Sequence, residues 1–284
     1  MAELLHPTYF CEPFGEEYAD ALLHQAEHFA STTNLYDNRP DMSVVVASLA
    51  DTPWEVNRLM NDIQYQKGVG AVETVFANCG NEDVTIRAMQ QRGARVIDVA
   101  PGEGFRADVL NCGLAAAHNQ IVFTTVGHAA LSSDVQLRAA AECVRSLGVA
   151  GAYGLALPDG NASWVERQGA IMLGAGRMLK EGYSPMWEGG MGLLAADCSV
   201  VDRDTIIAQG MYPTIYGAGG ADGCMGQKLI ENNLGVGRDP LLSVHHTHGL
   251  GPVNVIRQVL AWRRMAEPRD WKELELRWHP KGGF

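Results

Sequence analysis

The sequence predicts an α/β fold with a mostly parallel central sheet flanked by helices. Short apolar runs alternate with amphipathic segments between residues 41 and 126, and the run at residues 43–48 (Ser-Val-Val-Val-Ala-Ser) is rich in β-branched residues. A strand that is buried on both faces of a parallel sheet has this kind of continuous apolar sequence. Because strands and helices alternate at short intervals, the expected arrangement is a right-handed, mostly parallel sheet.

The expected elements follow one another with short connections. Pro53 suits the first turn of a helix in which Trp54, Leu59 and Ile63 are the apolar positions. The turn at residues 78–81 (Asn-Cys-Gly-Asn) closes the second strand. We expect strands at residues 43–48, 72–77, 95–100 and 121–126, and helices at residues 53–66, 83–92 and 105–118.

The pattern divides the chain into three parts. Residues 1–40 are an expected N-terminal helical extension, because six side chains share one helical stripe: Tyr18, Ala21, Leu22, Gln25, Ala26 and Phe29. Residues 41–265 are the main domain, whose second half has glycine-rich loops and ends in an amphipathic helix at residues 253–265. Residues 266–284 are a C-terminal tail with little periodicity.

Composition narrows the class of protein. The chain has 284 residues, 46% of them hydrophobic, which is enough to bury a sizeable core. Its net charge of −11 argues against nucleic acid or an anionic membrane as the main partner, although backbone amides or a metal can still hold a small anion. We see no signal-peptide pattern, no apolar run of the roughly 20 residues that cross a bilayer, and no Cys-x-x-Cys pair among six cysteines. We therefore expect a cytoplasmic protein that handles small molecules, and its oligomeric state stays open.

Parallel α/β sheets bind ligands beyond the carboxyl ends of their strands, here at residues 47–51, 77–81, 101–104 and 126–128. Residues 96–104 (Val-Ile-Asp-Val-Ala-Pro-Gly-Glu-Gly) resemble the first glycine-rich loop of S-adenosylmethionine-dependent methyltransferases. That family expects an acidic residue at the end of the next strand, and residues 124–128 here are Thr-Thr-Val-Gly-His. The methyltransferase stays an alternative at this point.

Over residues 41–265 the order of segments resembles a family 2 glycosyltransferase of the GT-A fold, which has a Rossmann-like nucleotide-binding half. The matching segments are Ala47-Ser48-Leu49, Asn78-Cys79-Gly80-Asn81, Asn111-Cys112-Gly113, Ala221-Asp222 and His246-Thr247-His248-Gly249. The resemblance implies transfer of a sugar, with inversion, from a nucleotide-sugar donor to a hydroxyl acceptor. It also implies that Asp222 is the general base that takes the proton of that hydroxyl.

The same resemblance implies a set of donor-binding residues. They are Ala47, Ser48, Leu49, Asn78, Asn111, Val126, Gly127 and Arg203. Two positions depart from the family pattern: the aspartate that holds the base is replaced by Ala77, and the glutamate before Asp222 is replaced by Ala221. The base and the sugar of the donor therefore stay open.

The Asp-x-Asp metal motif of the family is degenerate here, because Val126-Gly127-His128 stands in its place. If His246 and His248 lie on a strand, they share one face and can join His128 in holding a divalent cation (Mn²⁺ or Mg²⁺) on the donor diphosphate. Imidazole suits Mn²⁺ or Zn²⁺ and suits Mg²⁺ poorly. Two alternatives stay open: histidines that bind phosphate or water without a metal, and a degenerate protein that binds a nucleotide or glycan without turnover.

The glycine-rich loop at residues 187–190 (Trp-Glu-Gly-Gly) is a candidate acceptor site. Trp187 can stack on a sugar face and Glu188 can bind sugar hydroxyls, while a core tryptophan beside a turn is the equal alternative. The identity of the acceptor stays open.

Overall fold

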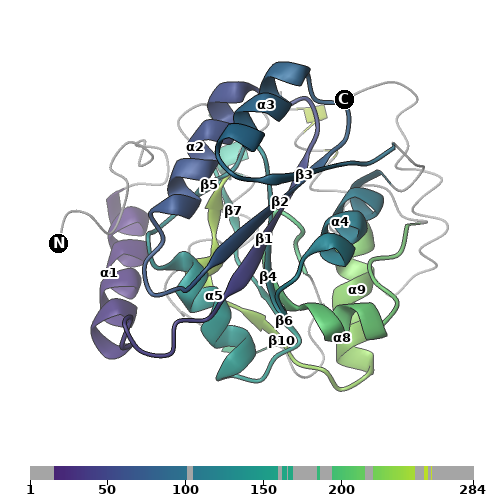
Figure 1. Cartoon of the computed structure of the whole chain (residues 1–284). Helices are drawn as coiled ribbons and strands as arrows, with labels where there is room; N and C mark the ends of the chain where they lie inside the picture. The colour runs from purple at the N-terminus through teal and green to yellow at the C-terminus, as the bar shows by residue number, and fades with distance from the viewer. Residues whose placement is uncertain are drawn as a thin grey trace.

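A computed structural model describes residues 16–100, 105–158, 162–164, 166–168, 184–185, 194–214, 220–246, 253–254 and 257. Within these ranges a central sheet lies between two layers of helices (Figure 1). The strands are β1 (Met42–Ser48), β2 (Val72–Asn78), β3 (Arg95–Asp98), β4 (Ile121–Val126), β5 (Ala130–Leu131), β6 (Gly151–Tyr153), β7 (Ala156–Leu157), β8 (Ser184–Pro185), β9 (Cys198–Asp202), β10 (Val236–Arg238) and β11 (Val244–His245). The helices are α1 (Glu16–Thr32), α2 (Pro53–Gln64), α3 (Asp83–Gln91), α4 (Phe105–Ala116), α5 (Gln136–Arg145), α8 (Arg203–Ala208), α9 (Gly220–Glu231) and the 3₁₀-helix η1 (Pro240–Leu242).

The first seven elements of the predicted domain, from β1 to β4, are confirmed, and their ends differ from the prediction by a few residues. Local chemistry fixes the start of α2: the Thr52 hydroxyl accepts the N–H of Glu55, and the Glu55 carboxylate accepts the N–H of Thr52. This capping box satisfies two amides that a helix start otherwise leaves unpaired, and Pro53 occupies the first turn.

The main sheet has the strand order β3-β2-β1-β4-β9-β6-β10-β8. Strands β3, β2, β1 and β4 are parallel, β6 and β10 are parallel to each other, and β9 runs antiparallel between β4 and β6. The predicted mostly parallel sheet is thus confirmed. A second, small sheet has the order β5-β11-β7.

The register makes β1, β2 and β4 end together. Ala47 pairs with Ala77 on one side and with Val126 on the other. We call this end of the sheet the carboxyl edge. The loops that follow these three strands therefore meet in one place, as a parallel sheet requires.

Alternate residues of β1 serve two separate cores. Val44 and Val46 pack with α2, α3 and α5, whereas Val45 packs with α4 and α9. All seven residues of β1 are buried, which explains why its sequence is a continuous apolar run. The expected N-terminal helix is also present as α1, whose Leu22 and Ala26 pack on α5 and η1.

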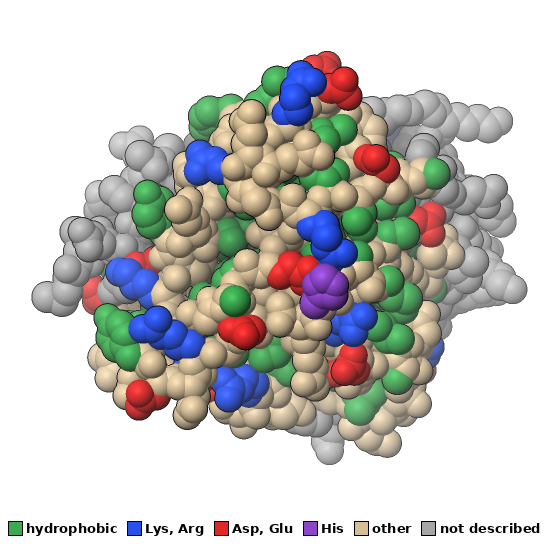
Figure 2. Space-filling view, in the orientation of Figure 1, with side chains coloured by type: hydrophobic (Ala, Val, Ile, Leu, Met, Phe, Trp, Pro, Cys, Tyr) green, Lys and Arg blue, Asp and Glu red, His purple; other side chains and the backbone are tan. Residues whose placement is uncertain are grey.

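Charged side chains of both signs are interspersed on the face that Figure 2 shows. This face therefore has no large electrostatic field of a single sign, although the chain as a whole has a net charge of −11. In the described part of the chain, no helix combines the length and the apolar character needed to cross a membrane.

Gly113 allows α4 to lie close on β1, and we expect Gly113→Ala to lower the free energy of unfolding. A Cβ at this position would stand 2.3 Å from Cγ1 of Val45. Overpacking costs about 1–3 kcal/mol, which outweighs the gain of about 1 kcal/mol in helix propensity. Urea unfolding of the single variants and of the Val45→Ala/Gly113→Ala double variant measures the coupling. Effects that add to within about 0.5 kcal/mol would contradict the predicted contact.

Candidate functional site

Two loops meet at the carboxyl edge with very little space between them. The N–H of Gly127, after β4, donates to the carbonyl of Ala47 at 3.3 Å. A Cβ on Gly127 would lie 2.1 Å from Oδ2 of Asp51, so glycine is needed where β4 passes the loop after β1. Gly127 thereby brings His128 against Asp51.

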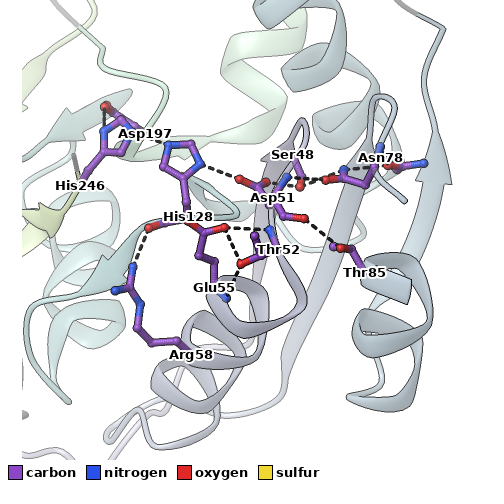
Figure 3. A network of polar contacts seen from close by, with 11 residues as sticks. Ser48, Asp51, Thr52, Glu55, Arg58, Asn78, Thr85, His128, Asp197 and His246 are labelled. Atoms are coloured by element: carbon purple, nitrogen blue, oxygen red, sulfur yellow. Dashed lines mark hydrogen bonds and ion pairs between the residues drawn. The ribbon is translucent and has the colours of Figure 1, made fainter. Parts of the chain in front are cut away.

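Asp51 is the centre of a buried polar network (Figure 3). The Ser48 hydroxyl donates to its carboxylate, and its own N–H donates to Oδ1 of Asn81 at 2.8 Å. The Thr85 hydroxyl donates to its carbonyl at 2.8 Å. A buried carboxylate is costly unless it is paired, and these bonds, with His128, fix its position.

Two histidines continue the network in a row (Figure 3). Nδ1 of His128 lies 2.6 Å from Oδ1 of Asp51, and Nε2 of His128 lies 2.8 Å from Nε2 of His246. Nδ1 of His246 lies 3.0 Å from Oδ2 of Asp197. The order is therefore carboxylate, imidazole, imidazole, carboxylate, and we call these four side chains the histidine pair and its carboxylates.

The small sheet explains why His246 lies next to His128 although more than a hundred residues separate them in the sequence. Strand β5 begins two residues after His128 and pairs antiparallel with β11, in the register Ala130 to His245. His246 follows directly after β11 and so comes to lie beside the loop that carries His128.

Helix α2 braces the same loop from the other side. Nη2 of Arg58 donates to the carbonyl of His128 at 2.6 Å, and Oδ2 of Asp62 accepts the N–H of Leu131 at 3.1 Å. Burial raises the pKa of Asp62 to about 7, against the opposing effects of the Leu131 amide and the Arg58 guanidinium. The segment from His128 to Leu131 is thus anchored at both ends.

Asp222 lies on the first turn of α9, buried, next to the turn that carries Asp197. Its Oδ2 accepts the N–H of Ala196 at 3.2 Å, one residue before Asp197. Burial and the nearby Asp222 charge raise the pKa of Tyr212. The predicted base and the histidine pair therefore flank the same short segment, residues 196–197.

The predicted donor residues at the ends of β1 and β2 lie at the carboxyl edge. Leu49 is exposed there, whereas Ala47 and Ser48 are buried. The amide of Asn78 accepts from Asn81 and donates to Asp98 at 2.7 Å, so it is engaged within the protein. Val126 is buried at the end of β4.

Two other predicted donor residues are placed elsewhere. The Asn111 amide bonds both backbone groups of Tyr212, at 2.7 and 3.0 Å, and joins α4 to the segment before α9. Arg203 follows Asp202, which pairs with Ile121 at the amino end of β4, and its Nε donates to the carbonyl of Leu114. The structure does not bring Arg203 to the carboxyl edge, because a whole strand separates them.

Three candidates, Trp187, Glu188 and His248, lie outside the described residues, as do residues 101–104 of the glycine-rich segment. Sequence reasoning did not assign a role to Asp51 or Asp197. The position of Asp51 could have indicated a role, since this residue follows the first strand at the expected binding edge. No local sequence pattern indicates a role for Asp197. In the described ranges, three or more His, Cys, Asp or Glu side chains do not cluster in a way that could hold a metal ion.

No protein-family model and no curated protein matches the chain by sequence. By structure it is similar to the mannosyltransferase PcManGT from Pyrobaculum calidifontis in complex with GDP-Man and Mn²⁺, with a TM-score of 0.56 and 15% identity over 87% of this chain and 72% of that one. It is also similar to S. aureus TarS 1–349 in complex with UDP, with a TM-score of 0.54 and 12% identity over 83% of this chain and 68% of that one. The chain has the GT-A glycosyltransferase fold, which confirms the predicted fold class.

We expect the free energy of unfolding of Asp62→Asn, measured relative to that of the wild type, to increase as the pH rises from about 4 to about 7. In that window the folded wild type holds a proton on Asp62 that the unfolded chain has lost, so raising the pH lowers its free energy of unfolding. Asparagine can still accept the Leu131 N–H and carries no titrating proton. Urea unfolding of both proteins at about pH 5 and about pH 8 measures the difference. An equal difference at both pH values would contradict the raised pKa.

Proposed function

We propose that this protein is a glycosyltransferase that transfers a sugar from a nucleotide-sugar donor to a hydroxyl acceptor, with inversion. The observation that carries the proposal is the histidine pair at the carboxyl edge of a GT-A fold, where α/β sheets bind their ligands. The similarity to transferases solved with GDP-Man and Mn²⁺ or with UDP supports a donor of this chemical class.

The donor lies, on this proposal, over the loops after β1, β2 and β4. His128 and His246 face its diphosphate, and the backbone at Ala47, Leu49 and Gly127 lines the approach. His128, His246 and His248 are the candidate ligands of a divalent cation such as Mn²⁺, because imidazole nitrogen suits this ion. The Nε2 atoms of His128 and His246 lie 2.8 Å apart and would have to separate to bind one cation together. When bound, such a cation neutralises the charge that develops on the leaving diphosphate.

Asp222 is the proposed general base. Its carboxylate takes the proton from the acceptor hydroxyl as the new oxygen–carbon bond forms at the anomeric carbon. The bond from that carbon to the diphosphate oxygen breaks on the opposite face, and the nucleoside diphosphate leaves with the electron pair. The hydrogen bond from the Ala196 N–H to Asp222 supports this assignment, because Ala196 directly precedes Asp197, which contacts His246.

A binding protein without turnover is the second candidate, favoured by two apolar residues at family motif positions. Val126 stands where the first aspartate of the metal motif is expected, and Ala77 where the base-binding aspartate is expected; both are buried. Sugar transfer is favoured over binding alone, since His128 offers an imidazole at the last position of the motif.

We expect hydrolysis or transfer with one member of a panel of nucleotide sugars in the presence of Mn²⁺, and a loss of about 10²–10⁴-fold in kcat in Asp222→Asn with donor binding retained. Asp204→Asn is the matched control, an exposed aspartate in the first turn of α8 near the opposite end of the sheet, and should keep full activity. Calorimetry measures donor binding, and release of nucleoside diphosphate measures turnover.

Donor binding without turnover in the wild type would identify the non-catalytic binding protein. Unchanged turnover in Asp222→Asn would overturn the assignment of the base. Tight binding of S-adenosylmethionine with no binding of any nucleotide sugar would favour the methyltransferase over the transferase.

A further inference from the structure

We propose that a cavity at the end of the main sheet where β1 and β4 begin binds a sugar phosphate. Arg39 and Arg145 hold the phosphate, and neighbouring amide and carboxylate side chains hold the sugar hydroxyls. We call it the amino-edge cavity. It takes no part in the proposed function, so its ligand binds whether or not the chain transfers a sugar.

The amino-edge cavity lies at the end of the sheet opposite the candidate functional site, where the loop from α1 enters β1 (Figure 1). Its volume of about 620 Å³ falls within the range of about 300–1,000 Å³ that small-molecule sites have. The seven residues of β1 separate it from the carboxyl edge by roughly 20 Å. Its polar lining comes from four segments of the chain and consists of Asn38, Arg39, Asp41, Gln120, Arg145 and Asp202.

The two arginines have no carboxylate partner among the described residues. Nη1 of Arg145 donates to the carbonyl of Asn38 at 2.9 Å, which brings this side chain to the loop that carries Arg39. The guanidinium of Arg39 lies 5.3 Å from the ring centroid of Tyr36. Each guanidinium has five N–H donors and binds phosphate oxygens in pairs, so most donors remain for a ligand. The two positive charges suit a phosphate monoester, which carries up to about two negative charges.

The two aspartates of the cavity are held in place by backbone amides. Oδ1 of Asp41 accepts the N–H of Ala71 at 2.6 Å, and Oδ1 of Asp202 accepts the N–H of Thr205 at 2.8 Å. These carboxylates repel a bare phosphate, whereas the hydroxyls of a sugar can donate hydrogen bonds to them. The combination of guanidinium and carboxylate therefore favours a ligand with an anionic end and a hydroxyl-bearing end over a simple anion.

Asn38 and Gln120 add side-chain amides that suit hydroxyl groups. Nε2 of Gln120 donates to Oδ2 of Asp202 at 2.7 Å, which leaves the Gln120 side-chain oxygen as an acceptor. The side chain of Asn38 makes no hydrogen bond with the part of the chain that the structure describes. Because an amide both donates and accepts, it can bond a hydroxyl in either direction. Ile121 and Val144 line the same cavity and offer an apolar surface to the C–H groups of a sugar ring.

The test is calorimetric titration of the full chain with glucose 6-phosphate, inorganic phosphate and glucose as separate probes. We expect glucose 6-phosphate to bind at one site per chain and about tenfold or more tightly than the other two probes, because only this probe has both a phosphate and several hydroxyls. Thermal unfolding checks the result, since a ligand that binds the folded chain raises its Tm with increasing concentration.

Arg39→Gln and Arg145→Gln are the test variants. Each should weaken the binding of glucose 6-phosphate by about 10–100-fold, the effect of losing hydrogen bonds between charged groups. Arg87→Gln is the matched control, because Arg87 is an exposed arginine of α3 outside the cavity lining, and its affinity should equal that of the wild type. Circular dichroism checks folding. Arg39 makes no hydrogen bond with a described residue, so Arg39→Gln alone decides the test if Arg145→Gln unfolds.

No binding of glucose 6-phosphate, or binding to Arg39→Gln within about threefold of the wild type, would overturn the proposed site. Inorganic phosphate that binds as tightly as glucose 6-phosphate would overturn the choice of a sugar phosphate. Turnover of nucleotide sugars is measured separately. Sugar-phosphate binding that Arg39→Gln weakens, in a protein that turns over no donor, would remove the proposed function and leave the amino-edge site, and turnover without such binding would do the reverse.

Discussion

The buried carboxylate of Asp51 is the constraint on which the carboxyl edge of the sheet depends. Inside a protein such a charge is tolerated only when its oxygens are paired, and here Ser48 and His128 pair them. The close packing of the two loops follows from this need. Gly127 must lack a side chain so that the segment after β4 can pass Asp51, and His128 is the next residue of that segment. One residue thus couples the loop after β1 to the loop after β4.

The second half of the site comes from distant parts of the chain. His246 arrives through the pairing of β11 with β5, and Asp197 through the turn before the antiparallel strand β9. Neither placement depends on loop flexibility, because each residue lies within a few positions of a hydrogen-bonded strand. The four side chains are therefore held by the main sheet and the small sheet together, with α2 bracing the loop of His128 through Arg58.

Local patterns were sufficient to predict the first half of the fold and insufficient for the site. The run of β1 and the capping signals of α2 follow from periodicity and propensity, which depend on neighbouring residues alone. The antiparallel position of β9 in the sheet and the contact of His128 with His246 depend on residues that are far apart in the sequence. No local sequence pattern therefore predicts them. His128 and His246 were predicted as partners from family resemblance, whereas Asp197 and the position of Arg203 at the opposite end of β4 required the structure.

The arrangement also reconciles an acidic chain with an anionic ligand. The net charge of −11 is a sum over the whole chain, and charges of both signs are interspersed on the face that Figure 2 shows. The effect of that sum at a buried site is small compared with the effect of groups a few ångströms away. On the proposed function, the groups that a diphosphate meets at the carboxyl edge are the imidazoles of His128 and His246 and the backbone amides of the adjoining loops. Neither kind of group needs a basic protein surface around it to hold an anion. The acidic composition of the chain therefore does not count against an anionic donor.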